Sequence, residues 1–142
     1  MKISTKGRYA LRVMIDLAEQ RKTEYIPLKE IAMRQGISQK YLESIMTILS
    51  KNNYIEALHG KGGGYRLNRD PADYKVGEIL RLIEGTLAPV ACLECGAEPC
   101  ENASACKTLP MWERLNTLIN DYLDSVSISD LMDNGNVDNY VI

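Results

Sequence analysis

The stretch LKEIAMRQGISQKYLESIMT, residues 28–47, has the spacing of a helix-turn-helix. Ala32 is small enough for two short helices to cross closely, and Gly36 tolerates the positive φ angle that the turn between them requires. Leu42 and Ile45 then anchor the second helix in the core. This spacing predicts a pair of helices that reads DNA, although a plain helical hairpin would share it.

Helical periodicity continues on both sides of this stretch. Ser4 or Thr5 can cap a preceding helix, and Pro27 suits the first position of the helix that begins the motif. Ser38 can cap the reading helix in the same way. The predicted helices cover residues 5–18, 28–35, 39–51, 76–83 and 111–126.

A β-hairpin is predicted directly after the reading helix. Residues 54–58 alternate like a short strand, GKGGG at 60–64 is a turn, and residues 65–67 form the returning strand. In a winged helix, Lys61, with His59 and Arg66 nearby, would reach a minor groove or phosphates, whereas an ordinary hairpin would only have a flexible tip. The turn matches neither GxxxxGK[ST] nor GxGxxG, which excludes a nucleotide-binding loop.

The exposed start of the reading helix is expected to enter the major groove. Its hydroxyls and backbone amides suit phosphate, its glutamine can read adenine, and its glutamate can accept from cytosine unless it is only a solvated charge. Cations of the first helix, Lys2 and Arg12 included, fit phosphate anchoring or simple solvation. The candidate DNA-binding residues are Lys6, Arg8, Ser38, Gln39, Lys40, Tyr41, Glu43, Ser44, His59 and Lys61.

Charge is unevenly distributed along the 142 residues, although the net charge is only −2. Residues 1–69 contain 13 Lys and Arg against 6 Asp and Glu, whereas residues 70–142 contain 4 against 13. Unless solvated charges segregate by chance, this indicates a cationic surface for a polyanion. No apolar run reaches the about 18 residues of a membrane span, and the N-terminus lacks a signal-peptide core, so we expect a cytoplasmic protein with no membrane partner.

All four cysteines, Cys92, Cys95, Cys100 and Cys106, lie within 15 residues with the spacing C-x2-C-x4-C-x5-C. Thiolates at this density select zinc or an iron–sulfur cluster. The C-x2-C pair suits a structural zinc site, but the usual second pair is missing. Redox-sensing or unliganded thiols are the remaining alternative. With one histidine and no nucleophile–base arrangement, the sequence does not indicate an enzyme.

The last predicted helix carries an apolar face that can be buried against a second copy, giving a two-fold dimer with recognition helices about one DNA turn apart. Packing within the same chain is the alternative. The predicted fold is mostly α, with a winged helix-turn-helix domain at 1–84, a cysteine-rich loop at 85–108, and a dimerisation helix and tail at 109–142. The apolar face consists of Met111, Leu115, Leu118, Ile119, Tyr122, Leu123 and Val126.

Four segments, MKISTKGRYALRVMIDLA, IAMRQGISQKYLESIM, GKGGGYRL and VGEILRLIEG, resemble the bacterial family of winged-helix repressors that contains the iron–sulfur regulator IscR and the cysteine-metabolism regulator CymR. The resemblance covers roughly residues 1–130 and implies a homodimer on a pseudo-palindromic operator in double-stranded DNA. The family would have a minor-groove arginine where this chain has His59, and histidine is mostly neutral at pH 7. The wing contacts of this chain are therefore expected to differ.

The IscR-like branch of that family presents three cysteines, which Cys92, Cys100 and Cys106 match best. The resemblance thus implies an iron–sulfur cluster on these residues, [2Fe–2S] ahead of [4Fe–4S] or zinc, in a transcription regulator of iron–sulfur biogenesis switched by that cluster. Some relatives supply a histidine after the third cysteine, and this chain has Lys107 there. The fourth ligand would be Cys95, another residue of the dimer, or an exogenous thiol or water.

The CymR-like branch implies an alternative function. There the chain would regulate cysteine and sulfur metabolism with a protein partner, and its cysteines would bind zinc or sense redox. A cysteine-synthesis enzyme could capture the C-terminal carboxylate at Ile142, although chain termini are more often simply disordered.

Overall fold

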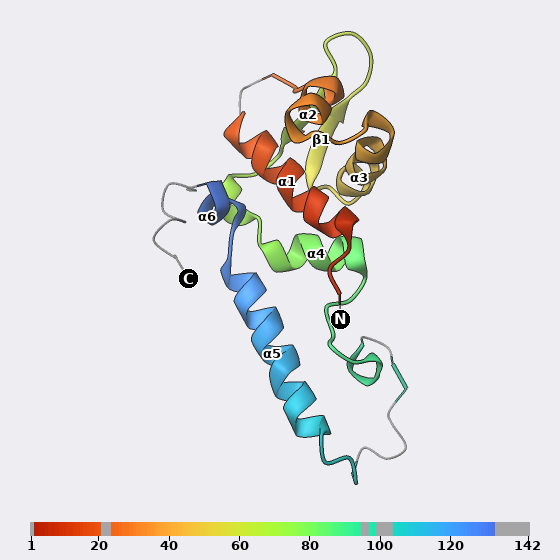
Figure 1. The fold of residues 1–142 in the computed structure, drawn as a ribbon. Coiled ribbons are helices and arrows are strands. Elements are labelled where there is room, and N and C mark those ends of the chain that lie inside the picture. Colours follow the sequence, from red (N-terminus) through yellow and green to blue (C-terminus); the bar gives the residue numbers. More distant parts are fainter. Residues whose placement is uncertain (1, 21–23, 95–96, 99–103, 133–142) are drawn as a thin grey trace.

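The computed structural model describes residues 2–20, 24–94, 97–98 and 104–132. A helical head with one two-stranded hairpin gives way to a long helix that extends from it (Figure 1). This arrangement confirms the predicted mostly α fold. The elements are α1 (Thr5–Glu19), α2 (Leu28–Gln35), α3 (Gln39–Lys51), β1 (Ile55–Leu58), β2 (Gly64–Leu67), η1 (Pro71–Asp73), α4 (Val76–Glu84), η2 (Ala91–Leu93), α5 (Leu109–Ser125) and α6 (Ile128–Met132).

Capping residues set the ends of the helices in the head. Ser4 caps α1 and Ser38 caps α3, each by accepting a hydrogen bond from the amide three residues further on, at 3.1 and 3.2 Å. Gly36 ends α2 with φ at 66°, a conformation that favours glycine. Pro27 lies one position earlier than predicted, because its extended ψ of 142° makes it the N-cap of α2.

The core is built around α1, which packs against α2, α4, α6 and β2. Every helix of the head contributes side chains to this core. Burying each large aliphatic side chain contributes about 1.5–3 kcal/mol to folding. Fully buried members of the core include Val13, Met14, Leu17, Ile31, Leu42, Ile45, Leu49, Ile79 and Ile128.

The hairpin is antiparallel, with Ile55 opposite Leu67. It gains an additional partner that the sequence analysis did not predict, because Ile26 exchanges backbone hydrogen bonds with Tyr65 at 2.8 and 2.9 Å. Gly64 allows this approach, since a Cβ atom there would lie 2.2 Å from the carbonyl oxygen of Ile26. The base of the wing is thereby attached to the segment that leads into α2.

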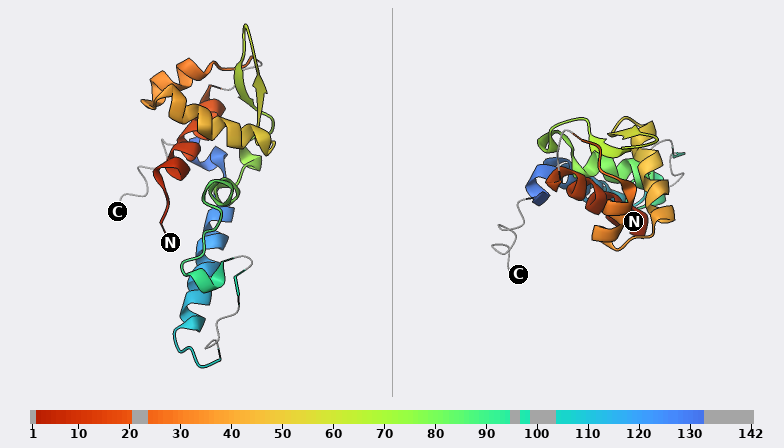
Figure 2. Two further views of the ribbon diagram at one scale, coloured as in Figure 1. Left: turned by 90° about the vertical axis from the view of Figure 1, so that its right-hand side faces the viewer. Right: turned by 90° about the horizontal axis from the view of Figure 1, so that it is seen from above.

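One side of α5 packs against α4 (Figure 2). Ile119, Leu123 and Val126 contact the cluster formed by Val76, Leu80 and Leu87. The other side of the helix is exposed, so the single apolar face expected from the sequence is divided between two directions. The exposed members are Met111, Leu115, Leu118 and Tyr122.

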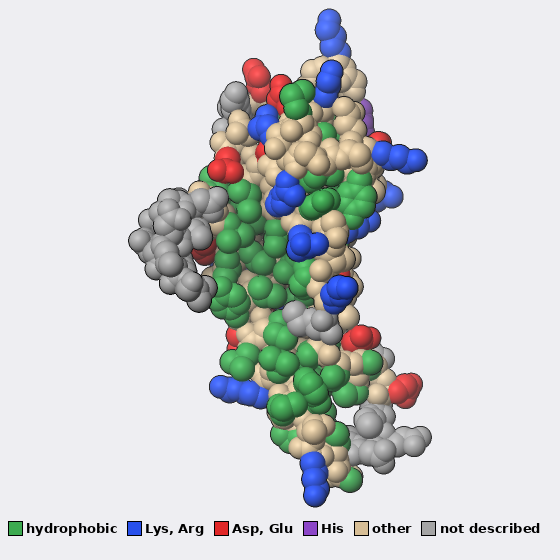
Figure 3. Space-filling view, in the orientation of Figure 1, with side chains coloured by type: hydrophobic (Ala, Val, Ile, Leu, Met, Phe, Trp, Pro, Cys, Tyr) green, Lys and Arg blue, Asp and Glu red, His purple; other side chains and the backbone are tan. Residues whose placement is uncertain are grey.

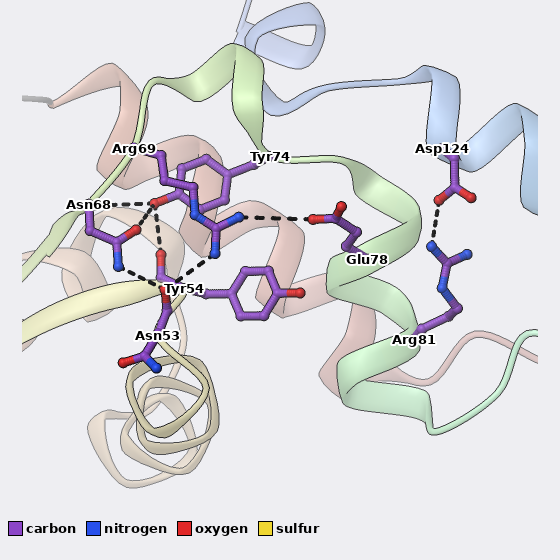
Figure 4. A network of polar contacts seen from close by, with 8 residues as sticks. All are labelled: Asn53, Tyr54, Asn68, Arg69, Tyr74, Glu78, Arg81 and Asp124. Carbon is purple, nitrogen blue, oxygen red and sulfur yellow. Dashed lines mark hydrogen bonds and ion pairs between the residues drawn. The ribbon is translucent and has the colours of Figure 1, made fainter.

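Polar contacts reinforce this packing and bring the chain back to the head. Arg81 of α4 donates to Asp124 of α5 at 2.6 Å (Figure 4), and a Cβ atom at Gly77 would lie 2.0 Å from the same carboxylate. After α5, the amide of Ile128 donates to the carbonyl of Tyr74 at 3.0 Å, and α6 packs against α1. Within the described ranges, no helix has both the length and the apolar character needed to cross a bilayer.

Tyr74 joins the wing, the end of α3 and the start of α4 (Figure 4). Its fully buried hydroxyl lies 2.7 Å from the carbonyl of Tyr54 and 2.9 Å from Oδ1 of Asn68, and it accepts from the amide of Asn68 at 3.1 Å. The Arg69 guanidinium lies 4.7 and 4.9 Å from the centres of these two tyrosine rings and 4.0 Å from Glu78 of α4. The wing and the reading helix are thus held against α4.

Replacing Tyr74 by phenylalanine removes this hydroxyl and leaves buried groups without their partner. We expect the free energy of unfolding to fall by about 1–3 kcal/mol, measured by urea denaturation. Tyr54→Phe is the control, because the Tyr54 hydroxyl makes no hydrogen bond within the described residues. Equal stability of the two variants would contradict this role of Tyr74.

Candidate functional site

The start of α3 forms an exposed strip on the head. Leu42 and Ile45 point into the core, which turns the polar side chains of the same turns outward. The Ser44 hydroxyl donates a hydrogen bond to the carbonyl of Tyr41 of the same helix at 2.7 Å. The structure thus brings together on one exposed surface the predicted readers Ser38, Gln39, Lys40, Tyr41, Glu43 and Ser44.

The wing follows α3 in the chain, and its first strand, β1, packs against that helix. His59 and Lys61 are exposed at its turn, as a role in phosphate contact requires. Burial, and then the charge of Glu43, raises the pKa of Tyr65 in β2. Arg66 instead pairs with Glu56 at 2.7 Å and belongs to the framework of the hairpin.

The cations of α1 divide into two groups. Arg8 is exposed and donates to the hydroxyl of Thr5 at 3.1 Å, and Lys6 is half-buried on the same turn. Arg12 donates to both the side-chain oxygen and the carbonyl of Gln35, so it stabilises the end of α2. Of these three cations, Arg12 is the one whose hydrogen bonds are directed into the fold.

A buried carboxylate holds α2 in position against α1. Asp16, 3% exposed, accepts from Arg34 at 2.8 and 3.0 Å and from Gln35 at 2.8 Å. The hydrogen bond to Asp16 raises the pKa of Arg34. The sequence contains a signal for this pair, because Asp16 interrupts the apolar face of the first helix between Met14 and Leu17. A charge at such a position requires a partner when it is buried.

The cysteine segment leaves α4 at Glu84, whose carboxylate is bound to the start of α1. One oxygen of Glu84 accepts from the amide of Ser4 at 3.0 Å and from its hydroxyl at 2.5 Å. Gly7 leaves room for this contact, since a Cβ atom there would lie 2.3 Å from the same oxygen. A carboxylate disfavoured at the end of α4 is therefore stabilised by the positive end of α1.

The two cysteines in the described part of the chain lie at opposite ends of the segment. Cys92 is exposed on η2, and Cys106 is half-buried just before α5. Cys95 and Cys100 lie outside the described residues. Among the described residues, no group of three or more metal-binding side chains forms.

The surroundings of Cys106 favour the thiolate over the thiol. Its sulfur lies 3.5 Å from the hydroxyl of Thr108, the residue that precedes α5. Hydrogen bonding from this hydroxyl, and then from the backbone amides of Thr108 and Leu109, lowers the pKa of the Cys106 thiol. The start of a helix therefore stabilises the form of sulfur that binds metals and reacts with electrophiles.

Replacing Thr108 by valine should raise the pKa of Cys106 and reduce its thiolate fraction at neutral pH. We expect iodoacetamide to alkylate Cys106 severalfold more slowly at pH 7, with the rate–pH profile moved to higher pH, as measured by mass spectrometry of metal-free protein. Thr117→Val, an exposed change on the same helix, should leave the profile unchanged. An unaltered profile in Thr108→Val would contradict the assignment.

Comparisons with known proteins agree with this architecture. Residues 3–134 match the Rrf2 family, described as iron-dependent transcriptional regulators. The HTH-type transcriptional regulator IscR of Aliivibrio salmonicida is 36% identical over 141 residues, covering 99% of this chain and 80% of the relative. CymR, the global cysteine regulator of B. subtilis, superposes with a TM-score of 0.75 at 34% identity and 93% and 96% coverage of the two chains.

IscR of T. potens superposes with a TM-score of 0.71 at 33% identity, covering 95% of this chain and 88% of the other. These relatives are named as regulators of transcription, which confirms that the chain is not an enzyme. The family match spans nearly the whole chain, including the helix-turn-helix, the wing and the cysteine segment. The chain belongs to the Rrf2 family of transcriptional regulators.

Proposed function

We propose that this protein is a homodimeric DNA-binding regulator of iron–sulfur biogenesis, switched by a cluster on Cys92, Cys100 and Cys106. The observation that carries the proposal is the head, where the start of α3 and the wing residues His59 and Lys61 are exposed in the predominantly basic half of the chain. Helix-turn-helix proteins place this part of the second helix in the major groove. We place the protein in the cytoplasm, with the DNA.

The exposed side of α5 is the proposed dimer interface. Met111, Leu115, Leu118 and Tyr122 are 54%, 37%, 50% and 67% exposed, at the four- and three-residue steps of one helical stripe. Figure 3 shows hydrophobic side chains gathered along this helix. A two-fold pair of such helices would bury both stripes and present two reading heads to the half-sites of a pseudo-palindromic operator.

The thiols fit an iron–sulfur cluster chemically. Such clusters are held by thiolates, and the hydrogen bonds at Thr108 favour the thiolate of Cys106. Cys92, at the other end of the segment, is exposed and accessible. When bound, a [2Fe–2S] group would supply a centre sensitive to oxidation and to iron supply, with Cys95 or an outside ligand completing the set.

The segment that carries these thiols is joined directly to the reading head. It begins at Glu84, which is hydrogen-bonded to Ser4, and α1 continues from there to Lys6 and Arg8. It ends at α5, which carries the proposed dimer stripe. Binding of a cluster to the segment would therefore act on both the position of α1 and the spacing of the two heads, a differential effect that can change affinity for DNA.

Reversing the charge of Lys40 and Lys61 together tests the DNA-binding surface. We expect binding to a fluorescein-labelled 30-bp duplex to weaken at least 100-fold at low salt, with a shallower salt dependence, measured by anisotropy. Lys107→Glu, a charge reversal just before α5 and outside the head, should change affinity much less. Sedimentation must show the same dimer in every variant. Parental affinity in the double variant would overturn the placement of the reading surface.

The cluster is tested on protein purified without oxygen. The parent should show visible absorption bleached by oxygen and about two iron atoms per chain. The absorption should be lost in each of the variants Cys92→Ser, Cys100→Ser and Cys106→Ser. Cys95→Ser should lose it only if Cys95 is the fourth ligand. If replacing all four cysteines changes neither metal content nor promoter occupancy, the switching proposal is wrong.

A second candidate function is favoured by the similarity to CymR, the global cysteine regulator of B. subtilis. In that case the chain regulates cysteine and sulfur metabolism with a protein partner, and its thiols bind zinc or sense redox. The proposed docking end, Ile142, lies outside the described residues. Colourless protein with one tightly bound zinc would support this function over the first.

A further inference from the structure

A hollow of about 380 Å³ opens between α1 and the beginning of α3, beside the predicted base readers. Four of its six lining residues carry a hydroxyl group, and none carries a carboxylate. Hydroxyl groups without competing acids suit an anionic oxygen ligand. The lining residues are Thr5, Tyr9, Gly36, Ile37, Ser38 and Tyr41.

The aromatic walls of the hollow are held in place. Tyr9 and Tyr41 meet edge to face, with ring centres 5.7 Å apart at an angle of 86°. The Arg12 guanidinium lies 5.1 Å from the centre of the Tyr9 ring and is itself bound to Gln35. Tyr9 is therefore held by Tyr41 of α3 and by Arg12, which lies on the same helix as Tyr9 and is bound to the end of α2.

A positive charge lies at the edge of the hollow. Arg8 reaches Thr5 at 3.1 Å and forms no ion pair with any described residue. In Figure 3, Lys and Arg side chains surround the hydrophobic surface over the adjoining parts of α1 and α3. The amide and hydroxyl of Ser4, at the start of α1, already bind the carboxylate of Glu84.

We propose that this hollow holds one phosphate of the DNA backbone, with the hydroxyls of Thr5 and Tyr9 donating to its oxygens and Arg8 balancing its charge. This rests on the proposed DNA-binding function and adds two residues of α1 to the surface. Phosphate contacts fix the register of a protein on DNA without reading sequence. A phosphate held here sets the depth at which Gln39 and Glu43 meet the base edges.

The hydroxyls are tested with Tyr9→Phe and Thr5→Val, using the full chain and a mixed-sequence 30-bp duplex. Each variant should bind about 3–10-fold more weakly, since one neutral hydrogen bond is lost. The slope of affinity against salt should stay unchanged, because a hydroxyl releases no counterion. Arg8→Ala should weaken binding and reduce this slope by about one. Tyr54→Phe and Lys107→Ala are the matched controls and should bind like the parent, with unchanged melting temperatures throughout.

A second measurement keeps this proposal separate from the first. Titration of ¹⁵N-labelled protein with inorganic phosphate should shift the amides of residues 5–9 and 38–41, and less so in Tyr9→Phe. If the parent binds no duplex but phosphate still shifts these amides, DNA binding fails and the phosphate site stands. Shifts confined to the wing, or parental duplex affinity in both hydroxyl variants, would overturn the phosphate site.

Discussion

The burial of one face of α1 is the constraint on which the rest of the structure depends. This face contains Val13, Met14 and Leu17, and the other elements of the head are arranged around it. Two polar contacts join other helices to α1. Asp16 binds Arg34 of α2, and the hydroxyl of Ser4 donates to Glu84 at the end of α4. Because proteins pack their interiors as densely as crystals, a shift of this helix cannot be absorbed locally. The position of the predicted DNA-reading surface therefore depends on the packing around α1.

Some cations of the molecule are exposed on the head, and others are paired with carboxylates of the fold. Lys40 and Lys61 are exposed on the head and form no ion pair with the described residues, whereas Arg34 and Arg66 are held by carboxylates within the fold. In the acidic half, Arg81 is likewise occupied by Asp124. A low net charge thus coexists with a strongly basic surface, because many of the acidic residues lie in a different part of the chain.

Much of the fold could be predicted because its signals are local. A capping serine, a glycine in the left-handed region and the spacing of apolar residues each act over a few positions, so α3 was placed with its observed ends. The hydrogen-bonded pairing of Ile26 with Tyr65 and the hollow between Tyr9 and Tyr41 could not be predicted, since each joins segments far apart in the sequence. The apolar face of the last helix was recognised, but periodicity does not show that two elements would share it.

The return of the chain from α5 to the head has a practical consequence. Ile128 comes from the last described helix, yet it is completely buried beside α1. A fragment that stops after α4 would lack this side chain and would leave a void in the centre of the head, at a cost of about 2–5 kcal/mol. Studies of the isolated head would then examine a weakened core, because the amino-terminal and carboxy-terminal parts of this protein complete one another.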